Sequence, residues 1–238
     1  MNGGATFFDE MHEPGGAVRD AYRGYQGWLS DQDAAFLRRK NRDAETLFRR
    51  IGITFNVYGA QEAEERLIPF DMVPRIITAS EWRRLSRGIE QRVRALNAFL
   101  HDLYHRQEII RAGRVPERLF RDNPAWLPNM VGFTPPGGIY THVVGIDLVR
   151  TGPDEFYVLE DNARTPSGVS YMLENRETMM AMFPELFMRV GVETVSNYPR
   201  RLARSLAACA PANTIGKPTL AVLTPGIFNS AFFEHAFL

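Results

Sequence analysis

One segment, 155–170, constrains the fold of this chain more than any other. It begins as a short strand, reaches the oxygen-rich run Glu160-Asp161-Asn162, and continues through Arg164 into a loop of small residues that ends at Gly168. A helix is expected from residue 169, because the apolar residues that follow Gly168 are spaced for one and a small-residue loop commonly precedes a helix. A strand that ends in carboxylates and leads directly into a helix predicts a chain of mixed α and β structure with a polar site at the end of the strand.

A partner strand is expected just before this one. Residues 140–149 form a second strand-like run, and the four residues 151–154, Thr-Gly-Pro-Asp, suit a hairpin turn. Side chains two apart on a strand point to the same face, so Glu160 and Asn162 should share a face that Asp161 does not. The sequence therefore predicts an antiparallel hairpin with oxygen ligands gathered at its open end.

The register of this hairpin decides how many ligands meet. Asp147 on the first strand lies near Glu160 if the turn is centred on Pro153, and a slip of one residue would send Asp147 to the opposite face. In the expected register, Asp147, Glu160 and Asn162 offer three oxygens at one spot. Mg²⁺ is typically held by one or two carboxylates, with water and substrate phosphates completing its shell. The alternative is that these acidic residues merely end a strand.

The residues after the strand suit a phosphate. Arg164 can reach a phosphoryl group, and arginine binds phosphate through two parallel hydrogen bonds. Ser167 and Gly168 stand where the next helix begins, and the free N–H groups and dipole of a helix N-terminus favour an anion. Ser167 can also be read as an ordinary N-cap. The segment 160–168 thus predicts a metal and nucleotide site.

The longest helix of the chain is expected from Thr78 onward. Thr78 and Glu81 have the spacing of a capping box, and an apolar stripe then recurs at three- and four-residue steps as far as Leu103. This stripe predicts a scaffold helix. Other elements are expected as helices at 31–50, 169–183, 199–210 and after 229, and as short strands at 51–58 and 219–224.

The expected fold class is α/β (α+β mixed), with a mixed sheet and flanking helices. Three units are predicted along the chain: a loose N-terminal segment, 1–30; a main unit, 31–210, which carries the hairpin; and 211–238, a strand, a turn and the beginning of a helix. The last unit resembles the opening of an α/β unit, so we expect the chain to be truncated there.

Composition limits the kinds of partner. Formal net charge is zero, which argues against nucleic acid or an anionic membrane surface as a partner. The single cysteine, Cys209, excludes an internal disulfide and suits a reducing cytoplasm. Early apolar runs are too short for a signal peptide or a membrane span.

A second metal-like motif lies at the end of the long helix. His101 and His105 are four residues apart, as in the H-E-x-x-H zinc motif, with Asp102 in place of glutamate. They are expected on the face opposite the apolar stripe, no third ligand is evident, and aspartate is shorter than the usual base. A solvated helix face is therefore favoured over a zinc hydrolase, which stays open as a rival.

Four segments resemble the circularly permuted ATP-grasp proteins (type 2), which are distantly similar to glutathionylspermidine synthase. The most specific is 159–171, Leu-Glu-Asp-Asn-Ala-Arg-Thr-Pro-Ser-Gly-Val-Ser-Tyr, and the supporting segments are 70–77, 132–135 and 145–150. The resemblance runs from about Asp9 to the last residue, and this chain looks like the N-terminal portion of such a protein.

The resemblance implies a partial ATP-grasp fold and an ATP-dependent carboxylate–amine ligase that uses Mg²⁺, passes through an acyl phosphate and forms an amide. By the motif match, the metal ligands would be Asp147, Glu160 and Asn162. Arg164 would face the transferred phosphoryl group, with Arg150 as a further catalytic candidate. The cofactor-binding residues would be Arg164, Ser167, Gly168 and Ser170.

The resemblance also implies carboxylate and amine substrates, small molecules or peptides, and possible helical-bundle and transglutaminase-like partner proteins. Gly145 departs from the pattern, because the synthase relatives are expected to carry an arginine there; Arg150 is the nearest substitute. Lys40 and Lys217 are the only lysines available for the nucleotide. We therefore expect this chain alone to bind ATP weakly without turnover, and a non-catalytic nucleotide-binding or protein-interaction module is the main rival.

Overall fold

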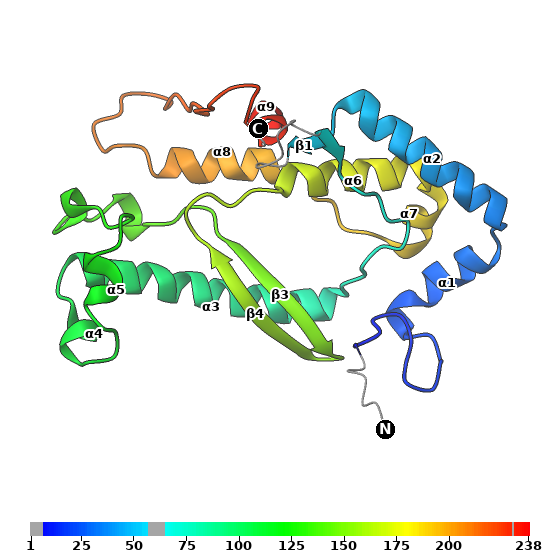
Figure 1. Ribbon diagram of the computed structural model, residues 1–238, viewed down its shortest axis with the longest axis horizontal. Coiled ribbons are helices and arrows are strands. Elements are labelled where there is room, and N and C mark those ends of the chain that lie inside the picture. Colours follow the sequence, from blue (N-terminus) through cyan, green and yellow to red (C-terminus); the bar gives the residue numbers. More distant parts are fainter. Residues whose placement is uncertain (1–6, 57–64, 230) are drawn as a thin grey trace.

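The computed structural model describes residues 7–56, 65–229 and 231–238, and mixes helices with antiparallel strands (Figure 1). The longer helices are α1 (Arg23–Ser30), α2 (Ala34–Ile51), α3 (Ala79–Tyr104), α6 (Val169–Met182), α7 (Pro184–Val190), α8 (Tyr198–Ala208) and α9 (Phe232–Phe237). Single turns of helix are η1 (Asp20–Tyr22), α4 (Glu108–Arg111), α5 (Arg118–Arg121), η2 (Pro128–Met130) and η3 (Pro136–Gly138).

The strands form two separate antiparallel pairs. β1 (Thr54–Asn56) pairs with β2 (Glu65–Leu67), and β3 (Gly145–Gly152) pairs with β4 (Glu155–Asn162). The expected α/β class is confirmed, although the described residues form two two-stranded antiparallel sheets in place of one mixed sheet. β4 has the expected bounds, whereas β3 starts five residues later than expected.

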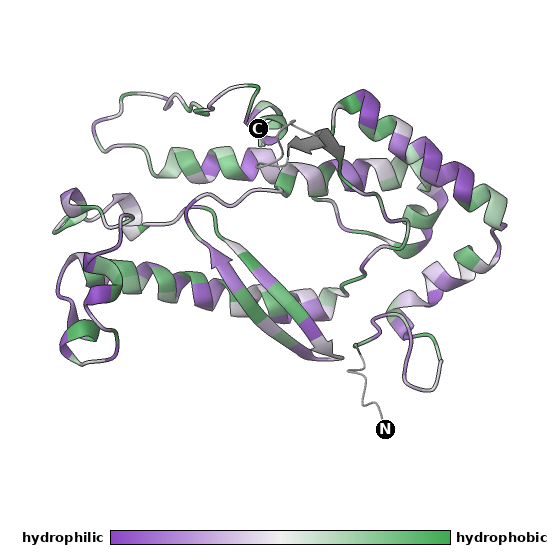
Figure 2. Ribbon diagram, viewed as in Figure 1, coloured by the Kyte–Doolittle hydropathy of each residue, from purple (hydrophilic) through white to green (hydrophobic). Residues whose placement is uncertain are grey.

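The scaffold helix α3 begins at the expected capping box. The Thr78 side chain accepts a hydrogen bond from the Glu81 N–H, and the Glu81 carboxylate accepts one from the Thr78 N–H at 2.8 Å. These two bonds satisfy donors that the first helical turn leaves open. The β3–β4 hairpin lies across this helix (Figure 1), and both strands carry hydrophobic and hydrophilic residues, with the hydrophilic run Glu160-Asp161-Asn162 at the end of β4 (Figure 2). α3 is therefore the platform that carries the hairpin.

The strand expected at 51–58 is shorter than predicted. α2 continues to Ile51 and ends at Gly52, which has a φ of 77° that suits glycine. β1 follows at Thr54, and Tyr58 lies outside the described residues. The helix extends further because the glycine, rather than the apolar alternation after it, sets where α2 stops.

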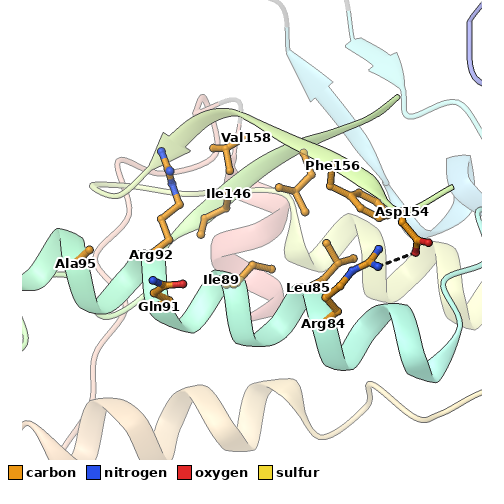
Figure 3. Close-up of a pocket in the computed structure, with 12 residues that line it drawn as sticks. Arg84, Leu85, Ile89, Gln91, Arg92, Ala95, Ile146, Asp154, Phe156 and Val158 are labelled. Carbon is orange, nitrogen blue, oxygen red and sulfur yellow. Dashed lines mark hydrogen bonds and ion pairs between the residues drawn. The ribbon is translucent and has the colours of Figure 1, made fainter. Parts of the chain in front are cut away.

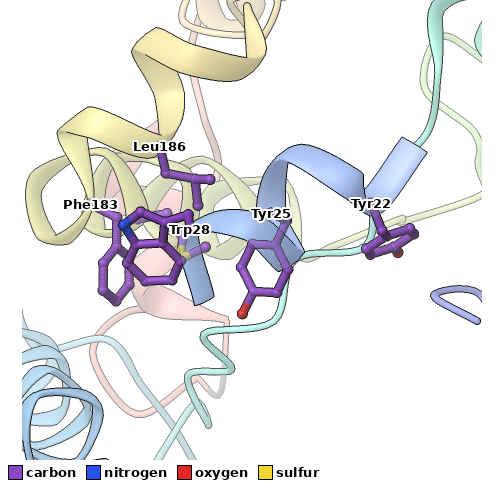
Figure 4. Close-up of a cluster of buried hydrophobic side chains, with 6 residues drawn as sticks. Tyr22, Tyr25, Trp28, Phe183 and Leu186 are labelled. Atoms are coloured by element: carbon purple, nitrogen blue, oxygen red, sulfur yellow. The ribbon is translucent and has the colours of Figure 1, made fainter. Parts of the chain in front are cut away.

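The hydrophobic core lies at the junction of α1 with α6 and α7. Three aromatic side chains from the N-terminal segment, Tyr22, Tyr25 and Trp28, are buried there against Phe183 and Leu186 (Figure 4). The Trp28 and Phe183 rings meet edge to face with centroids 5.0 Å apart, a favourable arrangement. The segment 1–30 was expected to be loose, but its second half is helical and supplies the centre of the core.

The strand expected at 219–224 is not formed. This segment has no regular secondary structure, and Val222 and Leu223 are exposed. A strand needs a neighbour to accept its backbone hydrogen bonds, and none of the described residues supplies one. The expected helix after residue 229 is present as α9, which packs on α6.

Within the described ranges, none of the helices combines the length and the apolar character that crossing a membrane requires.

Candidate functional site

The hairpin register brings the expected oxygen ligands together. Asp147 on β3 stands directly opposite Glu160 on β4, and Gly145 stands opposite Asn162. Cross-strand partners point to the same face of a sheet, and so do residues two apart on one strand. Asp147, Glu160 and Asn162 therefore share one face of the hairpin, as the sequence predicts.

A bulge in β4 sets this arrangement. Asp147 pairs with Glu160, but the next residue, Leu148, pairs with Val158, so Leu159 is the extra residue on β4. Leu159 is 72% exposed. In the part of the strand that follows a one-residue bulge, the side chains that would otherwise face α3 point away from it, and the others point toward it. Val158 before the bulge and Asp161 after it both face α3, and this leaves Glu160 on the outer face.

Ion pairs with arginines of α3 hold the inner face of the hairpin. Arg92 donates two hydrogen bonds to Asp161, at 2.7 and 2.6 Å, and Arg84 donates one to Asp154 at 2.6 Å. The hydrogen bonds from Arg92 lower the pKa of the Asp161 carboxyl below its usual value. Arg92 and the Arg84–Asp154 pair line a groove of about 490 Å³ between α3 and the hairpin and stand toward its two ends (Figure 3).

The outer face carries acidic side chains without a cation. Asp147 and Glu160 are both exposed, and neither forms an ion pair within the part of the chain that the structure describes. The Asn162 amide nitrogen donates to the Glu160 carboxylate at 3.0 Å, so the amide oxygen of Asn162 is left to accept. Two carboxylates and an amide oxygen form an all-oxygen donor set, which suits Mg²⁺.

The donor set leaves most of a metal's coordination shell to other groups. Within residues 7–56, 65–229 and 231–238, no three His, Cys, Asp or Glu side chains gather as a metal site. A Mg²⁺ ion at Asp147 and Glu160 would therefore keep positions open for water and substrate oxygens. This is the usual coordination of magnesium in sites that bind nucleotide phosphates.

Arg150 is not brought to the outer face. Its side chain is only 10% exposed and donates to the Glu81 carboxylate at 2.6 Å. It also lies 3.7 Å from Glu10 and contacts the rings of Phe8 and Phe156. The guanidinium is thus committed to a buried network between the hairpin turn, α3 and the N-terminal segment, and the structure places it apart from the predicted ligands.

The same network changes the acidity of Glu81. Partial burial raises the pKa of Glu81, but hydrogen bonds from Thr78 and the charge of Arg150 outweigh it, so the pKa of Glu81 is lowered overall. Its carboxylate both caps α3 and neutralises Arg150. Arg150 therefore stabilises the fold in this structure, whereas the sequence suggested a catalytic group.

The N-terminus of α6 already holds an anion. The N–H groups of Gly168 and Ser170 donate to Oε2 of Glu234 at 2.7 and 3.1 Å, and the Ser170 hydroxyl donates to the same atom at 2.8 Å. Glu234 comes from α9 and is 4% exposed. The sequence assigned Gly168 and Ser170 to a phosphate, but the structure pairs both with this carboxylate.

The other two predicted phosphate residues remain accessible. Arg164 and Ser167 are exposed in the loop between β4 and α6, and Arg164 lines a pocket of about 320 Å³. The loop packs closely on the hairpin at Gly145, where an added Cβ would stand 3.2 Å from Cβ of Pro166. Gly145 therefore permits this close approach at the position where the synthase relatives were expected to carry arginine.

The motif formed by His101 and His105 makes contacts within the fold. His101 and His105 stack with ring centroids 4.1 Å apart, and His105 contacts the His101 carbonyl and the Thr134 hydroxyl through its two ring nitrogens. Asp102 accepts the backbone N–H groups of residues 108 and 109. Backbone and hydroxyl contacts thus occupy both ring nitrogens of His105 and the carboxylate of Asp102, and the contacts of His105 with Thr134 and of His101 with Tyr140 attach the 128–140 region to α3.

Two residues of the site region escaped the sequence analysis. Glu234 was overlooked because it lies 64 residues from Ser170, and no local pattern links them. Arg92 was overlooked because an arginine on an exposed helix face is common; its partner Asp161 carried the only signal, a charged residue facing away from the predicted ligands.

Most of the chain is similar to known proteins. Residues 74–238 match the family described as circularly permuted ATP-grasp type 2. An uncharacterized protein of Synechocystis sp. is 40% identical over 98% of this chain and 48% of its own length. An uncharacterized protein of Mycobacterium tuberculosis is 46% identical over 98% of this chain and 42% of its own length.

A relative with a functional name is longer still. A protein of Frankia casuarinae named "Putative glutamate--cysteine ligase 2-2" is 40% identical over 98% of this chain and 27% of its own length. The chain therefore spans about half the length of the Synechocystis and Mycobacterium relatives, and about a quarter of the Frankia protein.

Proposed function

Because the chain belongs to the circularly permuted ATP-grasp type 2 family, we propose that it carries the Mg·ATP-binding part of a carboxylate–amine ligase. The name of the Frankia relatives, which describes a ligase that joins an amino acid to cysteine, supports the same reaction class. The observation that carries the proposal is the outer face of the hairpin, where Asp147 and Glu160 stand opposite each other without a cation.

The proposed reaction has two steps. A substrate carboxylate oxygen attacks the γ-phosphorus of ATP; the new O–P bond forms, the bond to the β-phosphate oxygen breaks, and ADP leaves. An amine nitrogen then attacks the acyl carbon, phosphate leaves with the C–O bond electrons, and the nitrogen loses a proton. Both steps build up negative charge on oxygen, so a catalyst gains most from positioned cations and hydrogen-bond donors.

The residues at the hairpin divide these tasks. Asp147 and Glu160 would hold Mg²⁺, with the Asn162 amide oxygen as a third ligand, and the ion would supply charge neutralisation at the phosphates. Arg164, exposed two residues beyond Asn162, would contact the transferred phosphoryl group. Ser167 is a further exposed polar residue in the loop before α6.

Glu234 reduces the number of backbone N–H groups that are available to bind a phosphate. The N–H groups of Gly168 and Ser170 already donate to its carboxylate, so a phosphate could reach them only if α9 moved away. In the present arrangement, the phosphate contacts fall to Arg164 and the metal. This reduced set of donors supports weak ATP binding by this chain.

A non-catalytic nucleotide-binding or protein-interaction module is the second candidate. It is favoured by the occupied N-terminus of α6 and by Gly145, which leaves no arginine beside Asp147. Such a module would keep the metal-dependent binding and lack turnover, so binding and turnover have to be measured separately.

The test is isothermal titration of Mg·ATP into the chain and into two variants of β4. Glu160→Gln removes one carboxylate from the outer face. Glu155→Gln removes another exposed carboxylate, at the other end of the same strand. We expect Glu160→Gln to weaken binding by about 10- to 100-fold, the loss that changes around a metal commonly cause, and Glu155→Gln to leave it unchanged. Binding that is equal in all three proteins would refute the metal site.

A further inference from the structure

A pocket of about 320 Å³ lies where the hairpin leads into α6. Its wall is formed by the loop after β4, by α8 and by α9. Apolar side chains from three segments line it, namely Val143, Val169 and Leu202, together with the aromatic rings of Tyr140 and Tyr198. Thr141 and His142, from the segment before β3, also line it, so the pocket is small and mixes apolar with polar groups.

A buried carboxylate lies in the wall of this pocket. Glu234 lines the pocket although the residue as a whole is only 4% exposed. Its Oε2 atom accepts all three hydrogen bonds from the start of α6. Its Oε1 atom accepts none from the residues that the structure describes. One oxygen thus fixes the side chain, and the other is left for a ligand.

The start of α6 directs hydrogen-bond donors at this carboxylate. The N-terminus of α6 stabilises an anion through its N–H groups and its dipole. The pKa of the Tyr198 phenol is raised, first by burial and then by the charge of Glu234, so Tyr198 stays protonated and adds no charge. Two other residues of the lining, Arg164 and His142, can carry a positive charge, and both are exposed, whereas Glu234 is buried.

We propose that this pocket binds the amine substrate of the ligase, a primary amine with a short apolar body, as its ammonium ion on Oε1 of Glu234. Oε2 of Glu234 is satisfied by the three hydrogen bonds from α6, whereas an ammonium group would donate to Oε1 and supply the opposite charge. The faces of Tyr140 and Tyr198 also attract a cation. The volume limits the body of the amine to a small group.

The position of the pocket suits this role. Ala163 and Arg164 line it, and they directly follow Asn162 of the predicted metal site. An amine held there would lie next to the place where Arg164 contacts the phosphoryl group. The inference rests on the proposed function for the identity of the bound amine as a substrate, but the binding itself requires neither nucleotide nor metal.

The test uses n-butylammonium as the probe and the ¹⁵N-labelled chain, observed by NMR without ATP or Mg²⁺. We expect saturable shifts of amides around residues 163–170 and in α9, and much weaker shifts with 1-butanol, the neutral analogue of the same size. Glu234→Gln keeps the size of the side chain and removes its charge, and it should weaken binding by about tenfold or more. Glu185→Gln, at the exposed start of α7, is the control and should bind normally.

A second variant covers the case in which Glu234→Gln does not fold. Leu202→Trp fills the pocket from α8 and leaves Glu234 in place. It should abolish the shifts while the circular dichroism spectrum stays unchanged. Equal binding of butanol and butylammonium, or unchanged amine binding in the folded variants, would overturn the proposal. If the chain binds the amine but does not bind Mg·ATP, the ligase assignment is refuted and the amine-binding proposal stands.

Discussion

On the side of the β3–β4 hairpin that faces α3, carboxylates meet arginines, whereas on the outer side they do not. Asp161 accepts two hydrogen bonds from Arg92, but Glu160, the preceding residue, accepts a side-chain hydrogen bond from Asn162 alone among the described residues. Both residues lie on the same strand, one position apart. The difference between them comes from the face to which each side chain points.

Pairing with arginine distinguishes the carboxylates that stabilise this fold from those that are candidates for a functional site. A carboxylate paired with arginine gains stability from the contact, so the fold itself accounts for its presence. Two unpaired carboxylates opposite each other repel, and the fold alone gives no reason to place them there. Asp147 and Glu160 are of the second kind, which is why the outer face is the candidate site.

The largest expected effect on stability comes from the inner face. Arg150→Met would leave Glu81 and Glu10 without their shared cation in a region that is mostly buried. Breaking a buried ion pair from one side typically costs about 3 kcal/mol, so we expect a loss of that order in the free energy of unfolding by urea. Arg87→Met on an exposed part of α3 is the control and should change it little.

The opposite outcome is expected on the outer face. The double change Asp147→Asn with Glu160→Gln removes two like charges that stand opposite each other. Stability in urea should stay equal or rise slightly, because cross-strand repulsion is relieved. A loss as large as that of Arg150→Met would mean that the outer carboxylates stabilise the fold, and the contrast between the faces would fail.

A local effect is expected from the pair at the end of β4. Arg92→Met releases Asp161 and should speed hydrogen exchange of the amides near Asn162, where β4 ends. Arg84→Met breaks the corresponding pair at the turn, with Asp154, and should affect the turn instead. Equal exchange at residues 160–162 in both variants would show that the Arg92 pair does not hold the ligand-bearing end.

The pairing also predicts an acid response. The pKa of Asp161 is lowered in the folded chain by the hydrogen bonds from Arg92, so this pair contributes stability above the unfolded pKa of about 4. That contribution is lost as pH falls through the folded pKa. The melting temperature of the chain should therefore drop below about pH 4, and less steeply in Arg92→Met. Parallel curves for the two proteins would contradict this.

The smallest effect is expected at Gly145. An alanine there would bring its Cβ to 3.2 Å from Pro166, so the neighbouring loop must shift by a few tenths of an ångström. We expect Gly145→Ala to lower stability by about 1 kcal/mol or less and to weaken Mg·ATP binding only slightly. A large loss of binding would show that the 163–168 loop needs its present position against the hairpin.

Local sequence signals predicted much of this arrangement. The capping box at Thr78 and Glu81, the bounds of β4, and the opposition of Asp147 and Glu160 were all predicted, because each depends on residues close in sequence or on the period of a strand. The bulge at Leu159 was not predicted, although the register depends on it, because bulges leave no strong pattern in a single sequence.

Contacts between distant segments could not be predicted. The aromatic residues of η1 and α1 become core through α6 and α7, which follow more than 140 residues later, and Glu234 reaches Ser170 across 64 residues. The apolar run at 219–224 has the composition of a strand but forms none, since a strand also needs a neighbour. In each case the decisive partner lies far away in the sequence.

We expect the outer face of the hairpin to bind a divalent cation and the inner face not to bind one. Mn²⁺ binding followed by electron paramagnetic resonance measures this difference. Glu160→Gln and Asp161→Asn change neighbouring residues by the same one charge on opposite faces. The account predicts that Glu160→Gln weakens Mn²⁺ binding by about tenfold or more, while Asp161→Asn keeps it within about threefold. Equal weakening in both variants, or none in either, would contradict it.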